Sequence, residues 1–337
     1  MRILVVSAGA TGGYFGARLA DAGRDVTFLV RPGRADQLRR DGLRVLSPHG
    51  DLNLKPRLLV AGAPTELFDV VLLAVKAFGL ERALDDFGPA VGPETMILPF
   101  LNGMRHIALL VERFGEAPVL GGVCVVAVAL DRHGRIAQLT SGLEALTYGE
   151  RDGSLTERAR ALDAELRGAG FDARLSTAIL QEMWEKWILL ASASAATCLL
   201  RGTVGAIEAA EGGADVTLRC LAETTAVAAA SGHPPREKFV EGTKTILTAS
   251  GSNLATSMYR DMQNGLPVEV EHILGDLTSR ALRLGLDTPL LDAATVQLRV
   301  YLNRLLQRRA TGAETGEAMV RVGGAMRLDA NAKGRAK

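Results

Sequence analysis

The chain has 337 residues, of which 47% are hydrophobic and 23% charged, and its formal net charge is +1. This composition is typical of a globular protein with a sizeable core, and the length favours two domains or one large one. A charge so close to zero argues against nucleic acid or an anionic membrane as a partner.

The three cysteines and the N-terminus indicate the cellular compartment in which we expect the protein. Cys124, Cys198 and Cys220 lie far apart in apolar segments, so we expect reduced core thiols and predict no disulfide framework and no metal site. Met1 leads directly into a predicted strand, and no apolar run reaches the ~18 residues of a membrane span. We therefore expect no signal peptide and no membrane segment, as in a cytoplasmic enzyme.

The first 20 residues have the order strand, glycine-rich turn and helix. Ile3–Val6 is a continuous apolar run typical of a buried parallel strand, and small and apolar residues recur at helical spacing from Tyr14 onward. Amide groups at the start of such a helix point at a pyrophosphate, and glycines let the backbone approach it. We therefore predict a dinucleotide-binding turn formed by Ser7, Ala8, Gly9, Ala10, Thr11 and Gly12.

The turn departs from the pattern G-x-G-x-x-G at one position. Ser7 stands where the first glycine is expected. That glycine serves the tight turn, so a serine is compatible with the pattern provided that its backbone angle is ordinary. The alternative is a glycine-rich turn in another kind of α/β protein, but the position at the N-terminus and the next strand both favour nucleotide binding.

The second predicted strand, Asp25–Val30, ends at Arg31, with Arg34 close behind. An acidic residue at this point holds the ribose 2′-hydroxyl of NAD, whereas an arginine suits the 2′-phosphate of NADP. A guanidinium presents a planar fork to phosphate oxygens. We therefore predict NADPH rather than NADH, the alternative being that Arg31 is a solvated charge at a strand end.

Two further strands end in residues that face the same sheet edge. Phe68–Val75 is followed by Lys76, and Met96–Leu101 is followed by Asn102 and Gly103. Ligands of open α/β sheets lie at the carboxyl ends of the strands, so Lys76 and Asn102 are candidate cofactor or substrate contacts. A solvated lysine and a plain Asn-Gly turn are the alternatives.

The remaining sequence of the first half predicts a hairpin and a set of closing strands. The stretch 35–65 reads as a short helix followed by two strand-like pieces, 43–46 and 52–54. Antiparallel strands are expected within 119–149, a helix over 156–169 and a last strand over 171–175. We place the first domain at 1–175, a helical domain at 176–310 and a flexible tail at 311–337.

The second half reads as helical almost throughout. Ile179–Leu200 is a long apolar helix with Lys186 on its apolar side. Desolvation lowers the pKa of a lysine and makes it a better proton donor, although a lysine that reaches solvent is an equal alternative here. We also predict an alanine-rich helix within 212–236, a helix with Glu269 in its first turn and a last helix over 293–309.

Six segments, in order and spacing, resemble the ketopantoate reductase family between Met1 and about Leu306. They are SAGATGGYFGARLA, LVRPG, LLAVKAF, LPFLNGM, WEKWILLA and TSMYRDMQNGLPVEVEHILG. The resemblance implies a Rossmann-type doubly wound sheet that binds NADPH, followed by an all-α domain like that of 6-phosphogluconate dehydrogenase. It implies reduction of 2-dehydropantoate to (R)-pantoate, a step of pantothenate and coenzyme A biosynthesis.

The same resemblance implies roles for individual residues. Gly9 and Gly12 would hold the pyrophosphate, Arg31 the 2′-phosphate, and Lys76 and Asn102 would line the cofactor and substrate cleft. Lys186 matches the catalytic lysine of the family, Ser257 a substrate-binding serine, and Glu269 a glutamate beside the active site. Lys186 would then donate the proton while NADPH donates the hydride.

The sequence differs from the family at two positions that bear on the substrate. The usual pattern has asparagines four and eight residues after the lysine, and here they are Leu190 and Ser194. A reductase of another, more apolar 2-oxo acid is therefore an alternative function. A non-catalytic NADP-binding sensor is a third, although such a sensor needs neither Lys186 nor Glu269. The apolar helical half is compatible with a homodimer.

Overall fold

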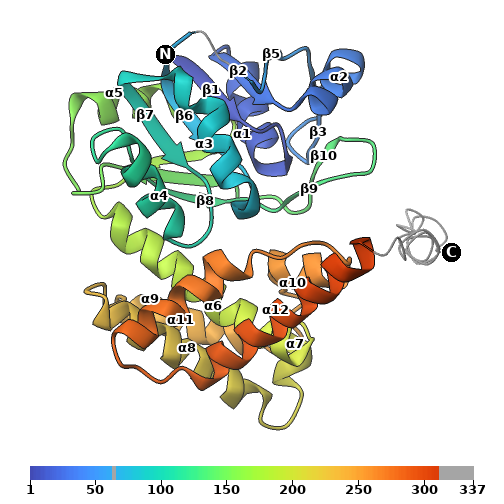
Figure 1. Cartoon of the computed structure of the whole chain (residues 1–337), viewed down its shortest axis with the longest axis vertical. Helices are drawn as coiled ribbons and strands as arrows, with labels where there is room; N and C mark the ends of the chain where they lie inside the picture. Colours follow the sequence, from blue (N-terminus) through green and yellow to red (C-terminus); the bar gives the residue numbers. More distant parts are fainter. Residues whose placement is uncertain (63–65, 311–337) are drawn as a thin grey trace, which may run out of the picture.

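The structure, a computed structural model, describes residues 1–62 and 66–310. It places a sheet-containing N-terminal half above a helical C-terminal half, joined by one long helix (Figure 1). The predicted tail over 311–337 lies outside the described residues. Within the described ranges, no helix combines the length and apolarity that crossing a bilayer would need. The prediction of a doubly wound sheet followed by a helical domain is confirmed.

The centre of the N-terminal half is a parallel sheet of five strands in the order β5-β2-β1-β6-β7. Its middle strand is buried on both faces, because Ile3 to Val6 are apolar and pair with β2 on one side and β6 on the other. The strands are β1 (Arg2–Val6), β2 (Asp25–Val30), β5 (Arg57–Val60), β6 (Phe68–Leu73) and β7 (Val91–Pro99). The connecting helices are α1 (Ala10–Asp21), α2 (Pro32–Asp41), α3 (Leu80–Phe87) and α4 (Arg105–Phe114), with 3₁₀ turns η1 (Ala77–Gly79) and η2 (Gly88–Ala90).

Two smaller sheets flank the first, and they correct part of the strand prediction. The hairpin of β3 (Leu43–Leu46) and β4 (Leu52–Leu54) is confirmed, but β5 at the sheet edge was not predicted. The later strands are β8 (Gly121–Val125), β9 (Val128–Leu130), β10 (Ile136–Gln138), β11 (Ala145–Gly149) and β12 (Asp172–Leu175). Antiparallel pairing, as predicted, joins β9 with β10 and β8 with β11, whereas β10 pairs parallel with β3 and β11 parallel with β12. Those long-range pairings have no local sequence signal.

The C-terminal half is built around α6, which spans Ile179–Leu200 as predicted and packs against α8, α10 and α12. Its other helices are α7 (Val204–Glu208), α8 (Gly213–Ala230), α9 (Glu237–Leu247), α10 (Ser257–Gln263), α11 (Asp276–Arg283) and α12 (Pro289–Ala310), with the π-helical turn η3 (Glu271–Gly275). The preceding helix, α5 (Glu157–Leu166), belongs to the first half. The helices α7, α9 and α10 were not predicted, and Glu269 precedes its helix rather than lying in the first turn.

The last helix begins four residues earlier than predicted, and the reason is a contact from another helix. The carboxylate of Glu223, on α8, accepts hydrogen bonds from the backbone amides of Leu290 and Leu291 at 2.9–3.2 Å. Pro289 needs no such partner because it has no amide hydrogen. A cap supplied from a distance of 67 residues cannot be read from the local pattern.

Ser7 does not have the ordinary backbone angle that the sequence argument required. Its φ is +84°, and only one other non-glycine residue in the described ranges, Arg201, has a positive φ. The turn therefore has the geometry that a glycine would adopt freely, and serine is strained in it. The Ser7 amide still donates to the carbonyl of Leu29 at 3.0 Å, which holds the turn in place.

We expect Ser7→Gly to stabilise the protein by about 0.5–1 kcal/mol. Relief of a left-handed side-chain clash is worth about 1–2 kcal/mol, and the greater freedom of glycine in the unfolded chain offsets part of it. Chemical denaturation of the variant beside the parent measures the difference. Ser7→Ala keeps the strain and serves as the control; equal stabilisation by both substitutions would contradict this explanation.

Candidate active site

The start of α1 lies at the carboxyl end of β1 and is shaped for close approach by a ligand. Gly9 is the N-cap, and no side chain caps the helix or places an acid in its first turn. A Cβ on Gly12 would lie 2.3 Å from the Ser7 carbonyl oxygen and 2.8 Å from the Ala74 Cβ. The first amides of α1 are thus open to an anion, and glycine is required at position 12 for the turn to close.

A cavity of about 270 Å³ opens beside this turn, at the carboxyl ends of β1 and β2. Of the predicted cofactor contacts, Ser7, Ala8, Arg31 and Lys76 line it, whereas Gly9, Ala10, Thr11, Gly12 and Asn102 do not. The Arg31 side chain is exposed and makes no hydrogen bond within the described ranges, so its guanidinium is available to a phosphate. The exposed ring of Phe78 also lines the cavity and was not predicted. This site has the glycine cradle, the helix start and the free guanidinium that a phosphorylated dinucleotide needs.

The Arg34 side chain lines the cavity and also hydrogen-bonds to the backbone of the turn. Its Nε donates to the carbonyl of Ala8 at 3.1 Å, and its Nη1 donates to the carbonyl of Gly134 at 3.1 Å. Burial lowers the pKa of its guanidinium from the ordinary value. Arg34 therefore ties the cofactor turn to the loop between β9 and β10.

Lys76 and Glu269 meet across the junction of the two halves. The Lys76 ammonium lies 2.9 Å from Asp261 Oδ2 and 3.5 Å from Glu269 Oε2, and the Ala77 amide donates to Glu269 Oε1 at 2.7 Å. Burial opposes the charge of Lys76, but these two carboxylates raise its pKa above the ordinary value. Asp261, which the sequence argument missed, is thus part of the junction, and it lies one turn after Ser257 on α10.

Lys186 lies on α6, facing β8. Its Nζ donates to the backbone carbonyl of Cys124 at 2.7 Å, which fixes the position of the ammonium group. Burial lowers its pKa, while the Cys124 thiol and the Glu269 carboxylate oppose the shift. Glu269 acts on Lys186 only through its charge, since its hydrogen bonds within the described ranges go to Lys76 and Ala77.

The loop after β7 reaches the same junction. Asn102 is half-buried and has no side-chain hydrogen bond among the described residues. Gly103 has φ +79°, and a Cβ there would lie 2.2 Å from the His272 carbonyl oxygen. Trp187 Nε1 donates to the Ile273 carbonyl at 2.9 Å on the other side of this contact. The Asn-Gly pair is therefore a close contact between the two halves, not merely a turn.

Two histidines near this loop had no signal in the sequence. His106 is fully buried, and neither of its ring nitrogens has a hydrogen-bond partner among the described residues. Burial lowers its pKa to about 3, with smaller contributions from the charges of His272 and Lys186. The pKa of His272 is lowered chiefly by burial as well. Both rings are therefore neutral near pH 7.

Leu190 and Ser194, the two positions at which the sequence differs from the family pattern, lie one and two turns after Lys186 on α6. Leu190 is half-buried, and Ser194 is 1% exposed. Ser257 begins α10, which packs against α6. A leucine side chain one turn from Lys186 offers no hydrogen bond to a substrate.

The thiol groups of the three cysteines take no part in this chemistry. Cys124, Cys198 and Cys220 are all free and buried. Burial raises the thiol pKa to about 11 for Cys124 and to about 12 for the other two. They are therefore protonated at neutral pH and unreactive as thiolates.

Comparison with known proteins covers both halves. The family model "Ketopantoate reductase PanE/ApbA" matches residues 3–153, and "Ketopantoate reductase PanE/ApbA C terminal" matches residues 178–302. "Uncharacterized oxidoreductase YkpB" of Bacillus subtilis (strain 168) is 38% identical over 301 residues, 89% of this chain and 99% of that protein.

A relative and a solved structure extend the comparison. "2-dehydropantoate 2-reductase" of Mesorhizobium japonicum is 29% identical over 325 residues, 89% of this chain and 97% of that protein. The structure of D-mandelate dehydrogenase with NADH and anilino(oxo)acetate superposes with a TM-score of 0.81 at 20% identity, covering 91% of this chain and 100% of that one. At that identity the likeness concerns the fold.

Proposed function

Because the chain belongs to the ketopantoate reductase family and is an oxidoreductase, we propose that it uses NADPH to reduce 2-dehydropantoate to (R)-pantoate. The observation that carries the proposal is Lys186. Its ammonium is held by the Cys124 carbonyl at 2.7 Å, at the junction of the two halves, and burial lowers its pKa. A lysine prepared in this way is a proton donor near neutral pH.

The residues of the site have separate roles in the proposed reaction. When bound, a reduced nicotinamide cofactor would supply the hydride for the 2-oxo carbon, and the oxygen of that carbonyl must then gain a proton. Lys186 stabilises the negative charge on that oxygen and donates the proton from Nζ. Neutral Lys186 then takes a proton from solvent. In this proposal Asn102 and Ser257, which are both half-buried, bind the carboxylate or hydroxyl groups of the substrate.

The cofactor preference follows from Arg31. Its exposed guanidinium at the end of β2 would hold the 2′-phosphate, and the open amides of α1 would hold the pyrophosphate. Lys76, which lines the cavity, contacts Glu269 of the other half and so links the two halves beside it. A cofactor without the 2′-phosphate loses the Arg31 contact and binds more weakly.

Leu190 favours a second candidate, a 2-oxo acid with a more apolar side chain. An asparagine one turn after Lys186 would pair with a polar substrate atom, and leucine leaves such an atom unpaired at a cost of about 1–3 kcal/mol. Other polar groups of the site would have to compensate for 2-dehydropantoate to remain the substrate. Under this candidate the roles of Lys186 and Arg31 are unchanged.

We expect the purified protein to oxidise NADPH with 2-dehydropantoate, and to use NADH with roughly tenfold lower kcat/KM because the Arg31 contact is lost. The assay compares 2-dehydropantoate with a panel of branched and aromatic 2-oxo acids. Turnover on only one of the other acids supports the second candidate, and Leu190→Asn should then gain activity on 2-dehydropantoate. Binding of NADPH without oxidation by any acid would instead indicate a sensor.

A further inference from the structure

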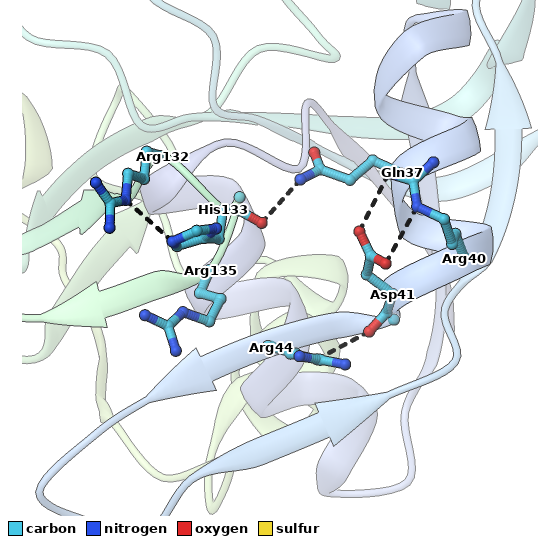
Figure 2. A pocket seen from close by; sticks show the side chains of 9 residues that line it. Gln37, Arg40, Asp41, Arg44, Arg132, His133 and Arg135 are labelled. Carbon is cyan, nitrogen blue, oxygen red and sulfur yellow. Dashed lines mark hydrogen bonds and ion pairs between the residues drawn. The ribbon is translucent and has the colours of Figure 1, made fainter. Parts of the chain in front are cut away.

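A second hollow, of about 570 Å³, lies in the N-terminal half. It is formed by the end of α2, the start of β3 and the turn between β9 and β10 (Figure 2). No residue that lines the cofactor cavity also lines this hollow. Its charged side chains are Arg40, Asp41, Arg44, Arg132 and Arg135.

The hollow gathers positive charge that the rest of the chain does not show. Four arginines and one aspartate line it, a formal charge of +3 with its histidine neutral, whereas the whole chain carries +1. In Figure 2 the side chains of Arg132 and Arg135 extend from the turn, on the side away from the helix that carries Arg40 and Asp41, and Arg44 lies between the two groups. Arginines from three separate segments thus line one hollow.

Neighbouring carboxylates pair with only some of the arginine side chains that line the hollow. Arg40 contacts Asp41 at 3.2 Å and Arg135 contacts Asp131 at 2.7 Å. Arg44 uses only its Nε, on the Asp41 carbonyl at 2.9 Å, and Arg132 uses only its Nε, on the His133 ring at 3.0 Å. Within the described ranges, the outer nitrogens of Arg44 and Arg132 have no hydrogen-bond partner.

We propose that this hollow binds the diphosphate or triphosphate group of a small metabolite, at a site separate from the cofactor. Guanidinium forks match pairs of phosphate oxygens, and several phosphates are needed to neutralise several arginines. Arg44 and Arg132 are the primary contacts because their outer nitrogens are open. Arg40 and Arg135 add charge while remaining paired with their aspartates.

Hydrogen bonds among Arg34, Gln37 and His133 connect the lining of the cofactor cavity to the lining of the hollow. Gln37 Nε2 donates to the His133 carbonyl at 2.9 Å, and Arg34 Nη1 donates to Gln37 Oε1 at 2.8 Å. Gly134 packs against both side chains, since a Cβ there would lie 2.1 Å from Gln37 and 2.6 Å from Arg34. The turn that carries Arg132 is therefore held in place, and the two ligands can be bound together.

The test is calorimetric titration of the full-length protein with inorganic tripolyphosphate at low salt, in the presence of saturating NADP⁺. We expect binding under this condition, and roughly five- to tenfold weaker binding for each of Arg44→Ser and Arg132→Ser. Arg39→Ser is the matched control, because Arg39 lies on the same helix, pairs with Asp36 and does not line the hollow. It should stay within about twofold of the parent.

Three results would overturn the proposal. The first is that NADP⁺ abolishes tripolyphosphate binding, which would place the anion in the cofactor cavity. The second is that Arg39→Ser weakens binding as much as Arg132→Ser, which would indicate a general charge effect. The third is that a single-stranded oligonucleotide binds more tightly than tripolyphosphate and depends on the same arginines. Thermal melts of each variant show that it is folded before it is titrated.

Discussion

Lys186→Ala is expected to lower kcat by roughly 10²–10⁴-fold, the contribution typical of a positioned general acid. The Kd for NADPH should change by less than about twofold, because the groups proposed to bind the phosphates lie on the other half of the chain. Single-turnover kinetics with a bound-cofactor fluorescence titration separates these two quantities. Lys244→Ala, which removes an exposed lysine paired with Glu241, is the matched control.

The same residue predicts the alkaline limb of the pH profile. Burial lowers the pKa of Lys186 below its ordinary value, and the proton donor must be charged to act. Activity is therefore full below that lowered pKa and is lost as the pH rises through it, earlier than for an exposed lysine. Lys186→Arg keeps the charge but does not release its proton, so it should restore little of kcat. Near-normal turnover in Lys186→Ala would remove the lysine from the mechanism.

Gly12→Ala is expected to have the second largest effect, on the cofactor site and on stability together. The added methyl would lie 2.3 Å from a backbone oxygen of Ser7, which cannot move aside without opening the turn. We expect the Kd for NADPH to rise by roughly tenfold or more and the free energy of unfolding to fall by about 1–3 kcal/mol. Fluorescence titration and chemical denaturation measure the two effects.

Gly33→Ala is the control for that substitution. Gly33 also lies at a helix start near the cofactor, but nothing lies within 4 Å of a Cβ there and its φ is not positive. Alanine should be neutral or slightly stabilising at this position because it restricts the unfolded chain. If Gly33→Ala weakened NADPH binding as much as Gly12→Ala, the effect would come from loss of helix-start glycine in general and not from the contact with Ser7.

Local sequence patterns indicated the parts of the site but not their pairings. The order strand, glycine turn, helix placed Gly12, and the apolar helix around Lys186 indicated its desolvation. The partners of these residues were missed, because Asp261 reaches Lys76 over 185 residues and the Cys124 carbonyl reaches Lys186 over 62. Ser7 shows the opposite case, since its residue type was noticed but its strained backbone was not.

By itself, the sequence determined the class of fold, the bounds of α6 and the family of the enzyme, because each depends on short-range periodicity or on motifs in a fixed order. Only the tertiary structure decided which residues of the two halves contact each other at the site. Glu269 pairs with Lys76 rather than with Lys186, and Gly103 packs against a carbonyl of the other half. These contacts depend on how two folded halves are placed against each other, and that placement is set by packing between residues far apart in the chain.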